Sequence, residues 1–380
     1  MKTASPKPTS RGTSLGSMNL STSFYPADNP AIKSWERDVG ARKPRALEFL
    51  CKYLNFTIIV ALTVITLGAY TRLTNAGLGC PDWPFCYGQV IVPQASYAMA
   101  KAAAFKSAQV FEAAKALTEM VHRYMAGVLV LLVVFSTFFV KKIRKQGVDL
   151  NLFFPFFLIS IIIFQALFGM WTVTWKLLPL VVCAHLLLGA ILFCSLVLFR
   201  FSLRKNIIPP LPKAWRLAIF IGALLVFLQM LLGGFVSANY AGIACTKFPT
   251  CNGSFWPISM ETLKALKQLF VYPIGVNYQG GVFPQELRVA IQVVHRLGAL
   301  CVAFYSIGFA SILGFKSLVK DIFWQRMLGT MLFLLGVQVI LGIINVVYFL
   351  PLFSAVLHNI VAVLLFTTWM LMLSIKEPTK

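Results

Sequence analysis

The four histidines of this chain stand at repeated positions. His122 and His185 are as far apart in the sequence as His295 and His358. A single histidine on an apolar helix is more often a packing residue, but ionisable side chains within a membrane are costly and tend to mark function. Four at matching depth favour two pairs of facing ligands, the arrangement in which a helical bundle holds a haem iron.

Zinc is the alternative metal. A zinc site would need further cysteine, histidine or carboxylate ligands, and the second half of the chain offers no helix-borne carboxylate beside its histidines. The spacing therefore favours two haem sites with two histidine ligands each.

Glu119 distinguishes the two halves. It precedes His122 by three residues, so both side chains project from one face of a helix, and the equivalent residue in the second half is Gln292. A carboxylate beside a porphyrin can handle protons. The alternative is an interfacial glutamate without a chemical role. If Glu119 is functional, the first half performs the chemistry and the second half holds a permanent cofactor.

Arg123 and Arg296 directly follow a histidine in each half. A guanidinium group suits the carboxylates of haem propionates. Extension toward the lipid headgroups is an equally good explanation of either arginine. Both interpretations stay open from the sequence.

Two cysteine pairs occupy loops between apolar segments. Cys80 and Cys86 are six residues apart, as are Cys245 and Cys251, and each pair has a proline between its members. On an oxidising face such pairs can close small disulfide loops or exchange electrons as dithiols. Either pair alone lacks the ligands for a metal site.

An internal repeat relates the parts of the chain that carry these residues. LGAYTRLTNAGLGCPDWPFC, residues 67–86, aligns without gaps to LGGFVSANYAGIACTKFPTC, residues 232–251, at an offset of 165. The histidine positions repeat at an offset of 173, as do Gln165 and Gln338. The repeat predicts two halves of parallel topology.

Apolar segments must position these side chains. A bilayer core about 30 Å thick requires roughly 20 apolar residues per helix. Eight segments meet that length, near residues 53–71, 120–140, 152–174, 180–199, 215–237, 289–312, 327–349 and 352–374. We therefore expect an all-α polytopic membrane protein whose eight transmembrane helices form two pseudo-symmetric four-helix bundles, residues 45–205 and 206–380.

Composition supports this fold class. The 380 residues are 58% hydrophobic and 12% charged, whereas soluble domains carry about 25% charged residues. The net charge of +22 comes from basic clusters near 42–52, 141–145, 200–205 and 316–326, on every second connection. That distribution indicates membrane orientation and argues against a nucleic-acid surface. It places both termini in the cytoplasm, and residues 1–44 are predicted to be a disordered cytoplasmic tail.

The chain resembles the haem A synthase family. The resemblance rests on TRLTNAGLGCPDWPFCYGQ at 71–89, Glu119-x-x-His122-Arg123, His185, the second His-Arg pair and His358, and it covers roughly residues 50 to 375. It implies oxidation of the C8 methyl group of haem O to a formyl group, giving haem A for terminal oxidases.

The resemblance also implies residue roles. His122 and His185 would bracket the substrate haem with Glu119 essential to the reaction, and His295 and His358 would ligate a haem b cofactor. The loop cysteines would form the disulfides Cys80–Cys86 and Cys245–Cys251, as in bacterial members of the family. The implied location is the bacterial cytoplasmic membrane.

Other functions compete with this one. A di-haem b-type electron-transfer protein, linked to quinol, would use the same histidines but would not need Glu119. A transporter built from repeated bundles is less consistent, because no discontinuous helix or midplane charge pair is evident. The expected partners are haem O, membrane lipid, the enzyme that supplies haem O, an electron donor and a second copy of the chain. An iron with two histidine ligands leaves no open position for oxygen, so either one ligand leaves during turnover or the reaction follows another route.

Overall fold

The structure is a computed structural model that describes residues 45–102, 104–105, 110–204, 213–265, 267–268, 271–315 and 321–375. The predicted N-terminal tail, residues 1–44, lies outside the described residues, as do parts of two predicted basic connections, 205–212 and 316–320. Residues Arg45–Lys380 form one compact unit, which contains all the membrane helices.

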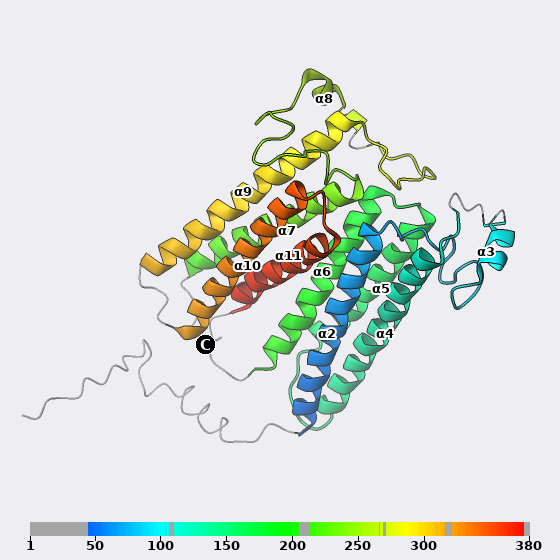
Figure 1. The fold of residues 1–380 in the computed structure, drawn as a ribbon. Helices are drawn as coiled ribbons and strands as arrows, with labels where there is room; N and C mark the ends of the chain where they lie inside the picture. Colours follow the sequence, from blue (N-terminus) through cyan, green and yellow to red (C-terminus); the bar gives the residue numbers. More distant parts are fainter. Residues whose placement is uncertain are drawn as a thin grey trace, which may run out of the picture. The chain divides into compact units, whose positions relative to one another are not determined.

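Within the described residues, eight helices are long and apolar enough to cross a membrane (Figure 1). They are α2 (Arg45–Leu73), α4 (Ala113–Arg144), α5 (Phe153–Thr174), α6 (Pro179–Ser202), α7 (Lys213–Ala238), α9 (Gln285–Phe315), α10 (Ile322–Val347) and α11 (Leu352–Ser374). Two short helices, α3 (Ala95–Lys101) and α8 (Met260–Ala265), lie in the long connections. The predicted fold class is confirmed: the protein is an all-α, multi-pass membrane protein.

The first two membrane helices are longer than their apolar segments. α2 begins at Arg45 although its apolar segment begins near residue 53, and α4 continues to Arg144. Helical hydrogen bonding continues into polar flanks that lie beyond a bilayer core about 30 Å thick. An ion pair between Lys52 and Glu48, one turn apart, supports the extension of α2.

The helices form two rings of four. In the first ring, α2 and α5 each pack against both α4 and α6; in the second, α7 and α10 each pack against both α9 and α11. Figure 1 shows the first ring in blue to green and the second in green to red. α4 and α6 therefore lie diagonally across the first ring, and α9 and α11 lie diagonally across the second.

Backbone conformation repeats with the sequence. Asn75 and Tyr240, equivalent at the offset of 165, both have φ of 54°. Lys176 and Phe349, equivalent at the second offset, have φ of 49° and 56° in the tight turns before α6 and α11. Left-handed backbone is uncommon for residues other than glycine, so its recurrence at both offsets supports pseudo-symmetric halves.

The two halves join along α6, α11, α2 and α7. α6 packs against both α7 and α11, and α11 also packs against α2. Near the ends of α2 and α7, Arg72 Nη2 donates a hydrogen bond of 2.5 Å to Ser237 O, and its guanidinium group lies 4.1 Å from the Tyr240 ring centroid. Arg72 and Ser237 are equivalent in the repeat, so this contact lies at the pseudo-symmetry axis.

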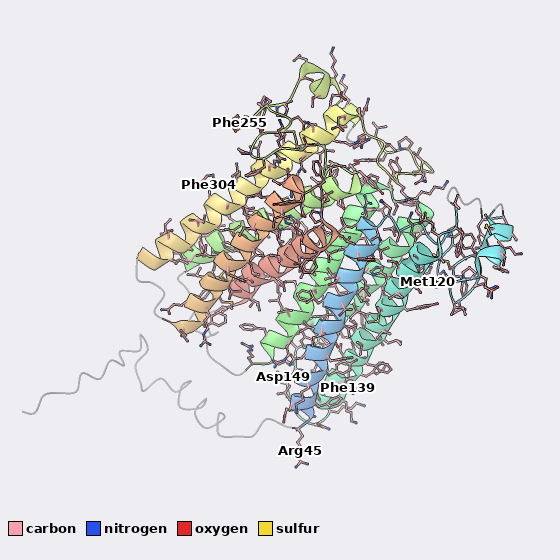
Figure 2. All side chains as sticks on the ribbon, in the orientation of Figure 1. Arg45, Met120, Phe139, Asp149, Phe255 and Phe304 are labelled. Atoms are coloured by element: carbon pink, nitrogen blue, oxygen red, sulfur yellow. A yellow bond between two sulfur atoms is a disulfide. The ribbon has the colours of Figure 1, made fainter. Side chains whose placement is uncertain are left out.

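Large apolar side chains cover the lateral faces of the helices. Phe304 on α9 is 73% exposed and Phe353 on α11 is 77% exposed. Figure 2 labels Phe304 where its helix faces away from its neighbours. Exposure of large apolar side chains on long helices is the pattern expected for surfaces in contact with lipid.

The connections 74–112 and 239–284 lie at one end of the membrane helices, which we call the disulfide end. Each connection contains one of the two cysteine pairs. The opposite end carries the basic residues Lys141, Lys142 and Arg144 of α4 and Arg200 of α6.

Candidate functional site

Each of the four histidines lies within about three turns of the end of its helix that is nearer the disulfide loops. His122 on α4 and His185 on α6 belong to the first ring and lie near each other. His295 on α9 and His358 on α11 do the same in the second ring. The predicted pairs are thus brought together on the diagonal helices of each ring.

A glycine of a neighbouring helix lies against each histidine ring. A methyl group at Gly68 of α2 would come within 3.0 Å of His122 Cε1, and one at Gly169 of α5 within 3.2 Å of His185 Cε1. The second half repeats both contacts, with 3.2 Å for Gly233 and His295 and 3.3 Å for Gly342 and His358. Larger side chains at these glycines would displace the imidazoles, so the repeat preserves space for the rings.

Glutamine amides lie beside three of the histidines. Gln165 Nε2 is 3.4 Å from His185 Nε2, and Gln338 Nε2 is 3.1 Å from His358 Nε2. These two contacts are equivalent in the repeat. A third glutamine, Gln229, lies 3.0 Å from His295 Nδ1 and has no counterpart in the first half.

The residues around each histidine pair fit a haem. Buried polar atoms without a hydrogen-bond partner are uncommon and call for an explanation. Within the described residues, such atoms include the Nδ1 atoms of His122, His185 and His358 and the Oε1 atoms of Gln165 and Gln338. Two imidazoles facing one another across an apolar bundle are a donor set suited to the axial positions of haem iron. In contrast, no cluster of three or more His, Cys, Asp or Glu side chains able to hold a metal ion occurs in the part of the chain that the structure describes.

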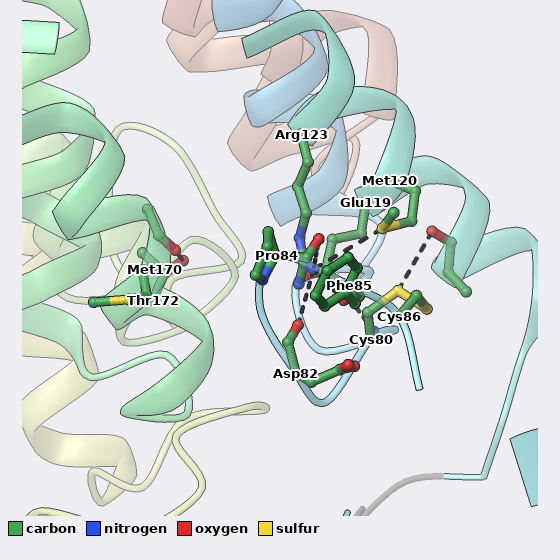
Figure 3. Close-up of polar contacts among 12 residues, drawn as sticks. Cys80, Asp82, Pro84, Phe85, Cys86, Glu119, Met120, Arg123, Met170 and Thr172 are labelled. Atoms are coloured by element: carbon green, nitrogen blue, oxygen red, sulfur yellow. Dashed lines mark hydrogen bonds and ion pairs between the residues drawn. A yellow bond between two sulfur atoms is a disulfide. The ribbon is translucent and has the colours of Figure 1, made fainter. Parts of the chain in front are cut away.

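Glu119 joins α4 to the first disulfide loop (Figure 3). Its side chain is nearly inaccessible, at 3% exposure. Glu119 Oε2 accepts a hydrogen bond of 2.9 Å from Cys80 N, and Oε1 lies 2.5 Å from Arg123 Nη2. The cysteine N–H and the guanidinium group together neutralise a carboxylate that would otherwise be costly to bury.

Arg123 extends this connection into the loop. Its Nη1 atom donates to the carbonyl oxygens of Asp82 at 2.9 Å and Phe85 at 2.7 Å. The ion pair and these bonds appear as dashed lines in Figure 3. Glu119 and Arg123 therefore act as a unit, and both nitrogens of the Arg123 fork have protein partners.

The second half keeps the arginine but not the ion pair. Arg296 Nη1 donates to the carbonyl oxygens of Lys247 at 3.2 Å and Thr250 at 3.1 Å, positions equivalent to Asp82 and Phe85. Gln292 replaces the glutamate and is buried, with its Nε2 atom 3.5 Å from Gly242 O. Among the described residues, Arg296 Nε and Nη2 are buried without partners. Arg296 Nη2 is thus unpartnered, whereas the equivalent Nη2 of Arg123 is paired with Glu119.

Both predicted cysteine pairs are disulfide bonds in the structure: Cys80–Cys86 and Cys245–Cys251. This confirms the pairing implied by the resemblance. Each disulfide closes the short loop whose carbonyl groups receive an arginine, Arg123 or Arg296. The bonds therefore stabilise the loops against which the arginines and Glu119 are held.

An apolar cavity of about 210 Å³ lies between α4 and α5 in the first half. Its walls include Val130 of α4, Ala166 and Met170 of α5 and Trp83 of the first disulfide loop. Ala166 neighbours Gln165, the residue beside His185. Ile163 and Leu167 of its wall are exposed, so the cavity opens on the lateral face of α5.

Sequence reasoning did not identify Gln229. The sequence repeat could have identified it. At the offset of 165, Gln229 aligns with Val64, so the second half has a polar residue where the first half has an apolar one. The predicted site residues are otherwise placed as two matching groups, each with two histidines, an arginine and a disulfide loop.

The fold and these sites define a class: a membrane protein of two fused four-helix bundles, each with one histidine on each of two diagonal helices. The family described as cytochrome oxidase assembly protein matches residues 52–370. The chain belongs to this family. It is 39% identical to a protein named heme A synthase from Shewanella oneidensis, over 83% of this chain and 93% of the relative.

More distant relatives carry the same name. The heme A synthase of Neorickettsia sennetsu is 25% identical over 82% of this chain and 94% of its own length. That of Rickettsia prowazekii is 26% identical over 83% and 94%. The similarity therefore extends across the whole membrane portion of the chain.

Proposed function

We propose that the protein is a haem A synthase, which oxidises the C8 methyl group of haem O to a formyl group. The first half binds the substrate haem between His122 and His185. The second half holds haem b between His295 and His358. Membership of the family and the names of its relatives support this function.

The observation that carries the assignment of the halves is the exchange of Glu119 for Gln292. Histidines, glycines, arginines and disulfides repeat between the halves, but the buried carboxylate does not. Conversion of a methyl group to a formyl group breaks C–H bonds and requires proton transfer, and Glu119 Oε1 and Oε2 are the buried carboxylate oxygens three residues from His122. A cofactor that only transfers electrons does not need a base at this position, so the reaction belongs to the first half.

The remaining site residues are proposed to bind and orient the two haems. His122 and His185 fix the plane of the substrate between α4 and α6, and Arg123 holds Glu119 in place. Arg296 Nε and Nη2, which lack partners within the described residues, would bind a propionate of haem b, an interaction that suits a guanidinium group. For Arg123 a propionate role is less favoured, because Glu119 occupies its Nη2 atom. When bound, haem b supplies one-electron redox chemistry.

The protein is proposed to lie in the bacterial cytoplasmic membrane with the disulfide end outside. The basic residues of α4 and α6 at the opposite end agree with the positive-inside rule. Disulfides persist in oxidising compartments, which supports the same orientation. Both termini would then be cytoplasmic. The enzyme that supplies haem O and an electron donor are the expected partners.

Chromatography of haems extracted from the purified protein tests the function. In cells that also make haem O, we expect haem B together with haem A or hydroxylated haem O. Haem B alone, despite abundant haem O, would contradict the synthase proposal and favour a di-haem electron-transfer cytochrome.

The apolar cavity between α4 and α5 gives a second test of substrate binding. Haem O carries a long isoprenoid chain, and we propose that this chain lies in the cavity beside Ala166. Ala166→Phe is expected to raise KM for haem O roughly 10-fold by steric exclusion, with haem b content unchanged. The measurement is haem A formation at varied haem O concentration.

A matched control exists in the second half. Val339 is equivalent to Ala166 in the repeat and faces outward from α10. Val339→Phe should leave KM within about twofold of its original value, because this position belongs to the half that is proposed to hold haem b and not haem O. Equal effects of the two substitutions would show that the cavity does not receive the chain.

A further inference from the structure

Each disulfide loop ends in a tight hairpin. In the first half, Cys86 and Gln89 exchange two backbone hydrogen bonds, of 2.9 and 3.0 Å. Tyr87 and Gly88 between them have φ of 52° and 79°. Residues 251–254 of the second half form the same pair of bonds, with φ of 53° and 96° at the two central positions. Positive φ at both central residues is typical of a type I′ turn, so each hairpin fixes the direction in which the chain leaves the loop.

Both hairpins lead directly into a pair of exposed apolar side chains. Val90 and Ile91 follow the first hairpin, and Phe255 and Trp256, their equivalents at the offset of 165, follow the second. Each of the four residues is at least 62% exposed. Clustered apolar side chains on a protein surface mark contact with a membrane or with another protein. The repeat places such a cluster at the same point of both halves.

The first apolar pair adjoins a lipid-facing stripe of α4. Exposed apolar side chains recur every three or four residues along this helix, at Leu117, Val121, Tyr124, Val128, Leu131, Phe135 and Phe138. The hydroxyl group of Tyr124 donates a hydrogen bond to the carbonyl oxygen of Val90. The chain that leaves the hairpin therefore lies against the stripe, near its disulfide end.

The second apolar pair has the same setting on α9. This helix carries an equivalent stripe of exposed side chains, at Val294, Leu297, Leu300, Phe304 and Ile307. Leu297 corresponds to Tyr124 at the offset of 173. Figure 2 labels Phe255 and Phe304 on the same side of α9. The surface that faces lipid thus continues from the helix onto the second loop.

The first loop also borders the lateral surface of the membrane helices through Trp83. This residue lines the apolar cavity together with Val130 of α4 and the exposed side chains Ile163 and Leu167 of α5. Val130 is eight residues beyond His122, which corresponds to roughly 12 Å along a helix. The loop therefore contributes to a surface that belongs to the membrane-spanning segments.

We propose that both disulfide hairpins lie in the headgroup region of the bilayer and insert their apolar pairs at the boundary with the acyl chains. Aromatic and apolar side chains are favoured at this depth. A bilayer surrounds the protein and meets the α4 and α9 stripes alike, whereas a protein docked on one side would cover only one of them. The lipid contact would also fix the height of the loops that receive Arg123 and Arg296.

Photo-crosslinking of the full chain in lipid nanodiscs tests the proposal. Benzoylphenylalanine replaces Ile91 or Trp256, with Phe304 as the lipid-facing reference and the exposed Glu112, at the start of α4, as the polar control. We expect phospholipid adducts at positions 91 and 256 in yields similar to those at 304 and at least about 10-fold above those at 112. Peptide mass spectrometry measures the adducts.

Adducts at 304 without adducts at 91 and 256 would overturn the proposal. Crosslinks from these positions to another protein or to a second copy of the chain in native membranes, in place of lipid adducts, would overturn it as well. A variant-free measurement uses the wild-type chain with a phospholipid that carries a diazirine near its headgroup. Peptides containing residues 90–91 and 255–256 should be labelled, and their protection would contradict the proposal. Neither measurement depends on bound haem, so the outcome is independent of the proposed function.

Discussion

Glu119→Gln is expected to lower the rate of haem A formation by roughly 100- to 10,000-fold, the range typical for loss of a general acid or base. Glutamine retains an oxygen that can accept the hydrogen bond from Cys80 N. It removes the charge that pairs with Arg123 and the capacity to take up a proton. The second half already carries glutamine at this position, as Gln292, so the substitution is compatible with the local helix packing.

The measurement is haem A formation by purified protein, with bound haem quantified in the same samples. Haem b content and both disulfides should be preserved. Glu112→Gln is the matched control, because Glu112 stands at the start of the same helix in an exposed ion pair with Lys115, and exposed pairs contribute little. Undiminished haem A formation in Glu119→Gln would exclude a catalytic role and leave Glu119 as a structural link between α4 and the disulfide loop.

Removing one histidine from each half should have opposite effects on haem content. His358→Ala is expected to lower haem b occupancy at least about 10-fold, because one of two axial ligands is lost, and to abolish haem A formation. His185→Ala should retain haem b and fail to bind haem O. Both histidines lie against a glycine and a glutamine in the same arrangement, so the two substitutions are structurally equivalent.

The haem content of each variant is measured by extraction and chromatography. Circular dichroism checks that each variant remains helical. Retention of haem O binding by His358→Ala would show that its first half is intact. The reverse pattern, loss of haem b in His185→Ala, would exchange the roles of the two halves and contradict the assignment based on Glu119.

Glu119 and Gln229 mark how the two halves have diverged. The first half has a buried ion pair and a histidine without an amide partner. Within the described residues, the second half has an arginine whose Nε and Nη2 atoms lack partners and a histidine that a glutamine contacts at ring and backbone. Both differences agree with the proposed division, in which the first half performs the chemistry and the second half holds a cofactor. The two differences are independent of each other. The first involves Glu119 of α4 and the first disulfide loop, whereas the second involves Gln229 of α7.

The sequence by itself determined the helices, the repeat and the histidine pairs. Long apolar segments must form helices in a membrane because lipid cannot satisfy backbone hydrogen bonds, so eight spans could be predicted from hydropathy. Equal sequence spacing of the histidines in both halves, within matching segments, then placed His122 with His185 and His295 with His358. The cysteine pairs, six residues apart, could be assigned as disulfides through the family resemblance.

The tertiary structure decided which side chains meet between helices. Arg123 and Arg296 were predicted to bind propionates or reach headgroups, but each donates to carbonyl groups of a loop that lies far from it in the sequence. The contact of Gln229 with His295 joins two different helices, α7 and α9. Such contacts depend on the relative rotation and axial shift of packed helices, which local hydrophobic periodicity does not specify. Covalent spacing determines which residues share a helix face, whereas packing determines what that face touches.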